Sequence, residues 1–214
     1  MVEGRKDREK LNLGSRIVLF IGPEGSGKTT IAKRLAEESG KPFITTGGIL
    51  RDLAANDDGP LGDEAREMFE NDAYLDGKTL LKILVDRFSK EDTVDGLVLD
   101  GGLRTLKETV DFQPMLEESG RALPLTVVFL NIPGEVSMER LVTGKSARKR
   151  EGDTHEGVKS RLSEFFNEFE ERIDYIKSEP TWDLIEIDAM PLMEEVYSSV
   201  IGAIGDVLQV EGAE

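Results

Sequence analysis

The stretch Gly22-Pro-Glu-Gly-Ser-Gly-Lys-Thr-Thr30 follows directly on a short apolar run, Arg16-Ile-Val-Leu-Phe-Ile21, and together they decide the fold. The run is rich in β-branched and aromatic residues, which favours a buried strand. The loop has the Gly-x-x-x-x-Gly-Lys-Thr spacing of a phosphate-binding loop, and a segment of helical period begins near Thr29. Strand, glycine-rich loop and helix in this order predict a site for the phosphates of a nucleoside triphosphate.

Each residue type in this loop has a chemical reason to be there. Glycines let successive backbone N–H groups converge on phosphate oxygens, and the positive end of the following helix adds to that field. Lys28 supplies a charge to the β- and γ-phosphates, while the hydroxyl of Thr29 or Thr30 reaches Mg²⁺ or its water. A glycine-rich turn with an incidental lysine is the competing interpretation, and the flanking strand and helix disfavour it. The residues expected to bind ATP here are Gly22, Gly25, Ser26, Gly27, Lys28, Thr29 and Thr30.

Strand-like and helical segments alternate along the rest of the chain. Further strands are expected at 42–45, 96–100, 124–132 and 182–187, and helices at 29–39, 62–71, 78–88, 135–141, 155–176 and 192–208. This order predicts an α/β fold with a five-stranded, mostly parallel sheet flanked by helices, and with ligands beyond the carboxyl ends of the strands. We expect a single domain over 1–214, with two excursions at about 46–75 and 143–157. Within the helix 155–176, Phe165, Phe166 and Phe169 are expected in the core, whereas His155 is expected on the surface.

Composition excludes several classes of function. The chain has no cysteine, which rules out disulfides, thiolate metal sites and thiol catalysis. Lys and Arg number 27 against 43 Asp and Glu, so the net charge of −16 makes nucleic acid a poor partner. No window approaches the roughly 18 apolar residues of a membrane span. We therefore expect a protein of the cytoplasm that contacts neither nucleic acid nor membrane.

Three further blocks of sequence resemble one known family. Ile44-Thr-Thr-Gly-Gly-Ile-Leu-Arg51 and Asp100-Gly-Gly-Leu-Arg-Thr105 each place an arginine just past a strand, and Arg150-Glu-Gly-Asp153 is followed by Arg161-Leu162. With the phosphate loop, these blocks are similar in order and spacing to the adenylate kinase family of nucleoside monophosphate kinases, over about 16–208. Several motifs in order are far more specific than one.

The resemblance implies a role for each matching residue. Arg51 and Arg104 would grip the phosphate of the monophosphate, since a guanidinium binds phosphate in a bidentate manner. Arg140 would stack on the adenine of ATP near Met190, and Asp100 with Thr29 would hold Mg²⁺ through water. Lys28, Arg104, Arg150 and Arg161 would act on the transferring group, and Asp153 would latch the lid. The implied monophosphate site comprises Thr46, Gly47, Arg51, Ala73, Tyr74, Leu75, Gly101, Arg104, Glu108, Arg150 and Arg161.

The reaction implied is transfer of the γ-phosphoryl group of ATP to a nucleoside monophosphate, most simply ATP + AMP giving two ADP. Catalysis then consists of in-line positioning and cationic stabilisation, with no need for a catalytic base. The excursion at 46–75 would be the monophosphate-binding flap, and 143–157 a short lid without zinc. Mg²⁺ is the expected cofactor, and short-lid members suggest a monomer.

Four departures from the family pattern bear on substrate and rate. Gly48 and the pair Gly102-Leu103 replace less flexible residues, and Gly144 stands where a lid arginine is expected, with Lys145 or Arg148 as substitutes. Glu108 occupies the position of a glutamine that reads adenine, and a carboxylate only accepts hydrogen bonds. Guanine would suit it better than adenine, although Thr46 matches the adenylate members. AMP is therefore the first expectation, and GMP or a pyrimidine monophosphate the alternative.

Two rival functions follow from the same residues. A nucleotide-binding regulator that has lost turnover predicts tight binding without transfer. A phosphate-loop hydrolase predicts phosphate release without an acceptor, and the arginines at 51, 104 and 161 argue against it.

Overall fold

The computed structural model describes residues 11–70, 77–145, 147 and 154–211. Five of the predicted site residues, Ala73, Tyr74, Leu75, Arg150 and Asp153, lie outside the described residues.

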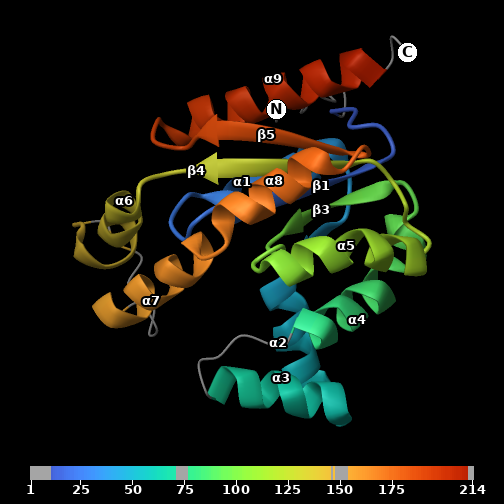
Figure 1. Cartoon of the computed structure of the whole chain (residues 1–214), viewed down its shortest axis with the longest axis horizontal. Coiled ribbons are helices and arrows are strands. Elements are labelled where there is room, and N and C mark those ends of the chain that lie inside the picture. Colours follow the sequence, from blue (N-terminus) through green and yellow to red (C-terminus); the bar gives the residue numbers. More distant parts are fainter. Residues whose placement is uncertain (1–10, 71–76, 146, 148–153, 212–214) are drawn as a thin grey trace, which may run out of the picture.

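A parallel five-stranded sheet forms the centre of the molecule (Figure 1). Its strands are β1 (Arg16–Ile21), β2 (Phe43–Thr45), β3 (Gly96–Asp100), β4 (Leu125–Asn131) and β5 (Trp182–Asp188). They lie in the order β2-β3-β1-β4-β5, and every neighbouring pair is parallel. The predicted fold class is confirmed. Because β1 is central, the loop that follows it opens at the middle of the carboxyl edge.

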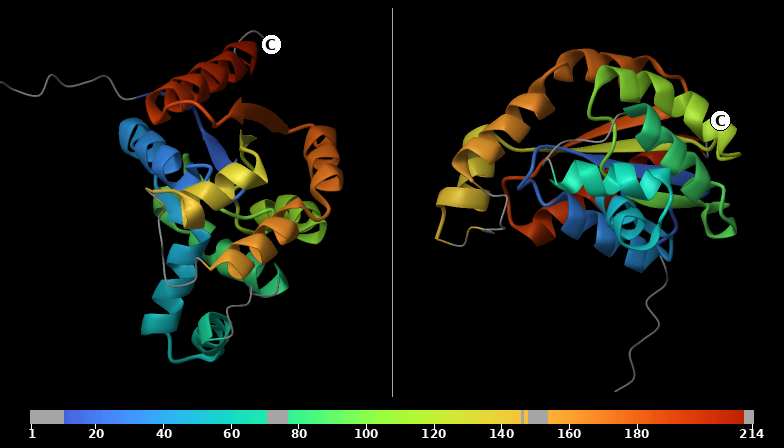
Figure 2. Two further views of the ribbon diagram at one scale, coloured as in Figure 1. Left: turned by 90° about the vertical axis from the view of Figure 1, so that its left-hand side faces the viewer. Right: turned by 90° about the horizontal axis from the view of Figure 1, so that it is seen from below.

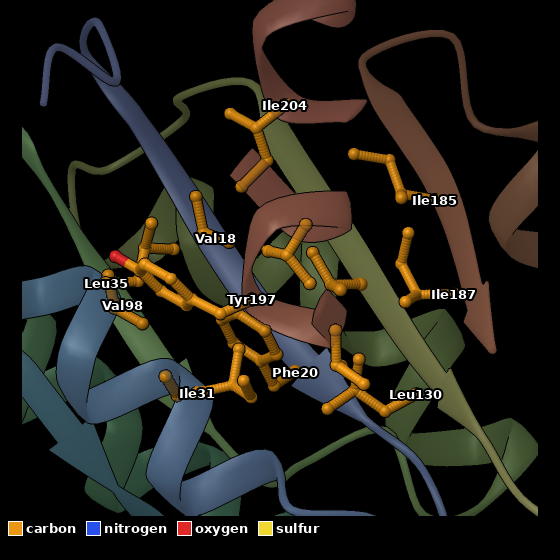
Figure 3. Packing of buried hydrophobic residues seen from close by; sticks show 14 of the residues in the cluster. Val18, Phe20, Ile31, Leu35, Val98, Leu130, Ile185, Ile187, Tyr197 and Ile204 are labelled. Atoms are coloured by element: carbon orange, nitrogen blue, oxygen red, sulfur yellow. The ribbon is translucent and has the colours of Figure 1, made fainter. Parts of the chain in front are cut away.

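Alternate side chains of β1 enter two separate cores. Val18 and Phe20 pack with α1 (Lys28–Ser39) and α9 (Met193–Glu211) on one face of the sheet (Figure 3). Ile17 and Leu19 pack on the other face with α4 (Gly77–Phe88), α5 (Leu106–Glu118) and α8 (Phe169–Ser178). All four side chains are fully buried. A strand buried on both faces needs a continuous apolar run, which is what the sequence shows.

Two further groups of helices extend away from the sheet, the first at the bottom of Figure 1 and the second at its left, beyond the carboxyl ends of the strands (Figures 1 and 2). α2 (Thr46–Asn56) and α3 (Pro60–Glu70) pack on each other around Leu50 and Ala65. α6 (Gly134–Met138) continues into a π-helical turn, η2 (Glu139–Thr143), and both lie beside α7 (His155–Phe166). A short 3₁₀ helix, η1 (Glu91–Thr93), precedes β3. Within the described residues, no helix combines the length and the apolar character that crossing a membrane requires.

The prediction of one helix over 155–176 was wrong. α7 ends at Phe166 and α8 begins at Phe169, because Glu168 takes a left-handed conformation with φ 54°. The bend brings Phe165 and Phe169 to the core but turns Phe166 outward, where it is 43% exposed. The placement of Phe166 in the core was therefore also wrong. His155 is exposed, as predicted.

Candidate functional site

A cavity of about 560 Å³ lies at the carboxyl edge of the sheet. Three helices begin beside it: α1 after β1, α2 after β2 and α5 after β3. The side chain of Thr45 caps α2 by accepting from the Gly48 amide, and Thr105 caps α5 by accepting from the Glu108 amide. Helix amino termini carry partial positive charge, so this edge attracts anions although the whole chain is acidic.

The glycine-rich loop forms one wall of the cavity. Gly25 and Gly27 have φ of 83° and 91°, which side-chain-bearing residues rarely adopt, and Gly27 is the cap of α1. The Lys28 ammonium donates to the carbonyl oxygens of Gly22 (2.6 Å) and Pro23 (2.9 Å), so it lies within the curl of the loop. The Ser26 hydroxyl is buried and has no hydrogen-bond partner within the described part of the chain. A curled loop of this kind at a helix amino terminus, with a lysine inside it, can hold phosphate oxygens.

Thr29 and Asp100 meet at the centre of the edge. The Thr29 hydroxyl donates to a carboxylate oxygen of Asp100 at 2.6 Å, although the two residues are 71 positions apart. A hydroxyl and a carboxylate are hard oxygen donors of the kind that Mg²⁺ takes in nucleotide sites, where it also keeps waters and phosphate oxygens. Among the described residues no cluster of three or more His, Asp or Glu side chains could hold a metal by itself. The pair thus fits a Mg²⁺ ion that arrives with a nucleotide.

Two arginines outside the glycine-rich loop also line the cavity. Arg51 comes from α2 and Arg104 from the loop between β3 and α5. Thr46 has a buried hydroxyl with no partner in the ranges described. A Cβ built on Gly101 would lie 3.3 Å from this hydroxyl and 3.9 Å from Arg104 Nη2. A buried hydroxyl of this kind costs free energy unless a ligand or water completes it. Two guanidinium groups, together with a buried hydroxyl that has no partner in the ranges described, indicate a second anion site.

Arg161 reaches the phosphate loop from α7. Its Nε donates to Glu24 Oε2 at 3.1 Å, and both residues line the cavity. The role of Glu24 was missed by sequence reasoning, which treated it as an unspecified position of the loop. No local pattern signals it, because its partner is 137 positions away.

Arg140 links the loop to the segment after β5. Its guanidinium donates to the Gly25 carbonyl at 3.0 Å and to the Ala189 carbonyl at 3.1 Å, with the Met190 carbonyl at 3.5 Å. The predicted neighbourhood of Arg140 and the main chain near Met190 is therefore present. The Met190 side chain is 46% exposed, so it lies at the surface beside this link.

The carboxylate of Glu108 binds backbone, whereas a residue that recognises the base of a nucleotide would have to face the cavity. The residue is only 6% exposed, and its Oε2 accepts from the Arg104 amide at 2.9 Å. It is not among the residues that line the described cavity. Its position on the first turn of α5 lets it hold the backbone of the preceding loop, much as in a capping box.

Of the predicted residues, the structure gathers Gly22, Gly25, Gly27, Lys28, Thr29, Thr30, Gly47, Arg51, Asp100, Gly101, Arg104, Arg140 and Arg161 around one cavity. Ser26, Thr46 and Glu108 are buried and do not line the cavity.

The sequence matches a family model described as "Adenylate kinase" over residues 20–181. The chain belongs to the adenylate kinase family. Among curated proteins, it is 34% identical to an adenylate kinase of Mycobacterium leprae, over 88% of this chain and 98% of that protein. It is 31% identical to adenylate kinases of Thermus thermophilus, over 88% of this chain and 96% of that protein, and of Xylella fastidiosa, over 89% and 99%.

Family membership agrees with the geometry of this adenylate kinase fold. The match begins within β1 and ends just before β5, so it contains the phosphate loop and the arginine-bearing segments. The chain is a nucleoside monophosphate kinase, with ATP and a nucleoside monophosphate as the substrates that the family implies.

Proposed function

We propose that this nucleoside monophosphate kinase transfers the γ-phosphoryl group of ATP to AMP and so forms two ADP. The observation that carries the proposal is the convergence of Arg51, Arg104 and Arg161 on the cavity that the phosphate loop also lines. These arginines come from three separate segments, and two opposed anion sites in one cavity suit an in-line transfer between two nucleotides.

In this proposal, ATP takes the loop side and the monophosphate takes the opposite side. Lys28 and the loop amides bind the β- and γ-phosphates, and Arg140 lies beside the adenine. Arg51 and Arg104 bind the acceptor phosphate, with Thr46 beside it. Arg161 neutralises charge on the transferring group, together with Arg150, which has a role by resemblance only. Because a phosphate oxygen is already nucleophilic, no side chain needs to remove a proton.

Thr29 and Asp100 fit a Mg²⁺ ion held through water, on the donor chemistry described above. When bound, the ion neutralises charge on the β- and γ-phosphates. The carboxylate of Asp100 orients the water shell, and Lys28 carries the remaining positive charge on this side. Zinc has no role in the proposal.

Two observations favour AMP over other monophosphates. The first is the names of the relatives, and the second is Thr46, which matches the adenylate members of the family. The curated relatives are named adenylate kinases, and they align over nearly their whole length. The burial of Glu108 and its bond to the Arg104 amide weaken the argument that its carboxylate selects guanine.

We further propose that the chain acts as one domain and as a monomer of the cytoplasm, without a nucleic acid partner. In this picture the segment 46–75 closes over the monophosphate, and 143–157 closes over the phosphates to exclude water.

A coupled assay for diphosphate formation tests the function. The purified chain is given Mg·ATP with AMP, GMP, CMP or UMP, and phosphate release is followed in parallel without any acceptor. We expect AMP to give the highest kcat/KM and phosphate release to be negligible. Turnover of another monophosphate with AMP inert would overturn the substrate, and ATP hydrolysis without transfer would overturn the reaction.

A further inference from the structure

Both non-glycine residues with positive φ in the described ranges lie at one junction. Leu103, in the loop before α5, has φ 51°, and Glu168, between α7 and α8, has φ 54°. Side chains other than Asn and Asp seldom adopt this conformation unless the surrounding structure imposes it. The junction therefore needs contacts that hold it in place.

Arg172 of α8 supplies those contacts from inside the protein. The residue is 2% exposed, and its Nη1 donates to the Leu103 carbonyl at 2.6 Å. Its Nη2 donates to the Phe165 carbonyl, and its Nε lies 3.4 Å from the Glu168 carbonyl. The rings of Phe165 and Phe169 lie 5.2 and 5.3 Å from the guanidinium carbon, within range of a cation–π contact. A single planar group thus satisfies carbonyls from both sides of the junction.

Two carboxylates complete the arrangement. Glu168 Oε2 accepts from the Leu106 amide at 3.1 Å, and Glu108 Oε2 accepts from the Arg104 amide at 2.9 Å. Burial lowers the pKa of Arg172, while the charges of Glu108 and Glu168 act in the opposite direction. A guanidinium still keeps its proton at neutral pH. The loop from Leu103 to Leu106 is therefore held at one carbonyl and two amides.

We propose that Arg172 is a positioning residue for Arg104. By holding the Leu103 carbonyl, Arg172 fixes the backbone from which Arg104 enters the cavity. Glu108 holds the N–H of the same peptide unit, and Glu168 holds the far end of the loop at the Leu106 amide. We name Arg172, Glu168 and Glu108 the junction clamp. This inference rests on the proposed function, since Arg104 is assigned there to the acceptor phosphate.

The clamp also joins the two sides of the cavity. Arg172 binds the carbonyl of Phe165, and Phe165 and Arg161 both line the cavity from α7. Arg104 and Arg161 are thus connected through one buried group rather than through two independent loops. Their separation governs how the acceptor and the transferring group align, so the clamp should matter for transfer and little for ATP alone.

Replacing Arg172 by Met tests the proposal, with Arg16→Met as the matched control. Arg16 is also an arginine that is 2% exposed, but it begins β1 at the opposite edge of the sheet, where it donates to Thr126. For Arg172→Met we expect kcat/KM for the monophosphate to fall about 10- to 100-fold, since small misplacements of a catalytic group cost that much. Affinity for a non-hydrolysable ATP analogue should stay within about twofold, because the phosphate loop is not touched. Arg172→Lys should not restore the rate, because an ammonium cannot make the same planar set of bonds.

Hydrogen exchange gives a readout that is independent of activity. In Arg172→Met the amides of Arg104 and Leu106 should exchange about tenfold faster than in the wild type, and in Arg16→Met they should not. Glu168→Ala, at an exposed side chain, should accelerate exchange at Leu106 even where Arg172→Met does not fold. If the wild type transfers phosphate to no monophosphate, the proposed function fails while the exchange result still decides on the clamp. The clamp would be overturned if Arg172→Met left both kcat/KM and the exchange of the Arg104 and Leu106 amides unchanged. It would also be overturned if Arg16→Met changed them equally.

Discussion

Replacing Glu24 by Gln should tighten the binding of ATP, because this carboxylate stands inside the cavity proposed for the triphosphate. Its Oε2 lies 3.1 Å from Arg161 Nε, and the side chains are 36% and 18% exposed, respectively. A bound triphosphate has to overcome repulsion from Glu24 and to compete with it for Arg161. The Gln variant removes both costs and keeps the volume of the side chain.

The partial burial of the pair sets the size of the effect. Ion pairs at exposed positions contribute about 0.2–1 kcal/mol, because water and salt screen them. Arg161 and Glu24 are less exposed to solvent than such pairs, but they remain open to the cavity. We therefore take the upper end of this range, about 1 kcal/mol, for their interaction. At 25 °C this corresponds to a Kd about fivefold lower for the variant. The difference should shrink as salt is raised, since screening weakens the charge that is being removed.

Isothermal titration with a non-hydrolysable ATP analogue and Mg²⁺ measures this difference directly. Glu37→Gln is the matched control, because Glu37 loses the same charge from an exposed site on α1, where it pairs only loosely with Lys33 at 3.9 Å. We expect the control to bind like the wild type at about 0.15 M salt. Equal or weaker binding by Glu24→Gln would refute the reasoning, and weaker binding would show in addition that the carboxylate supports the phosphate loop.

Four further substitutions test other parts of the site and fold. Arg51→Ala and Arg104→Ala should each lower kcat/KM for the monophosphate about 10²- to 10³-fold in the coupled assay, with ATP binding unchanged, as expected when a donor to the reacting group is lost. Asp100→Asn should raise the Mg²⁺ concentration needed for half-maximal activity about 10- to 100-fold, as losses of outer-shell ligands do; an unchanged Mg²⁺ titration would count against this metal assignment. Gly96→Ala should lower the free energy of unfolding by about 3 kcal/mol in urea titrations, because Gly96 has φ +99° and the new Cβ would lie 1.9 Å from the Arg16 carbonyl oxygen.

Sequence reasoning succeeded where one local pattern carries the information. β1 and β3 have the predicted bounds, because a short apolar run flanked by glycine is decisive for a strand buried on both faces. The break between α2 and α3 lies within Asn56-Asp-Asp-Gly-Pro60, a run of residues typical of turns. α5 was not predicted, since Pro114 lies inside it and proline usually ends a helix.

Two of the failures, the break at Glu168 and the contact of Glu24, share a physical cause, which is long-range contact. Asn167 is a weaker helix-end signal than Gly or Pro, and Glu168 is none. The left-handed turn there is held by Arg172, which in turn is satisfied by Leu103, 69 positions away. The same holds for Glu24, which the loop motif leaves free to vary and whose partner is 137 positions away. Glu108 is different, because its carboxylate binds the Arg104 amide only four positions away, a local contact of the capping-box kind. A motif states which side chains can bind phosphate, but the buried charges that aim those side chains follow from how the helices pack. Arg104 is a clear case: its place in the sequence indicated its chemistry, whereas its orientation depends on α8, which no motif includes.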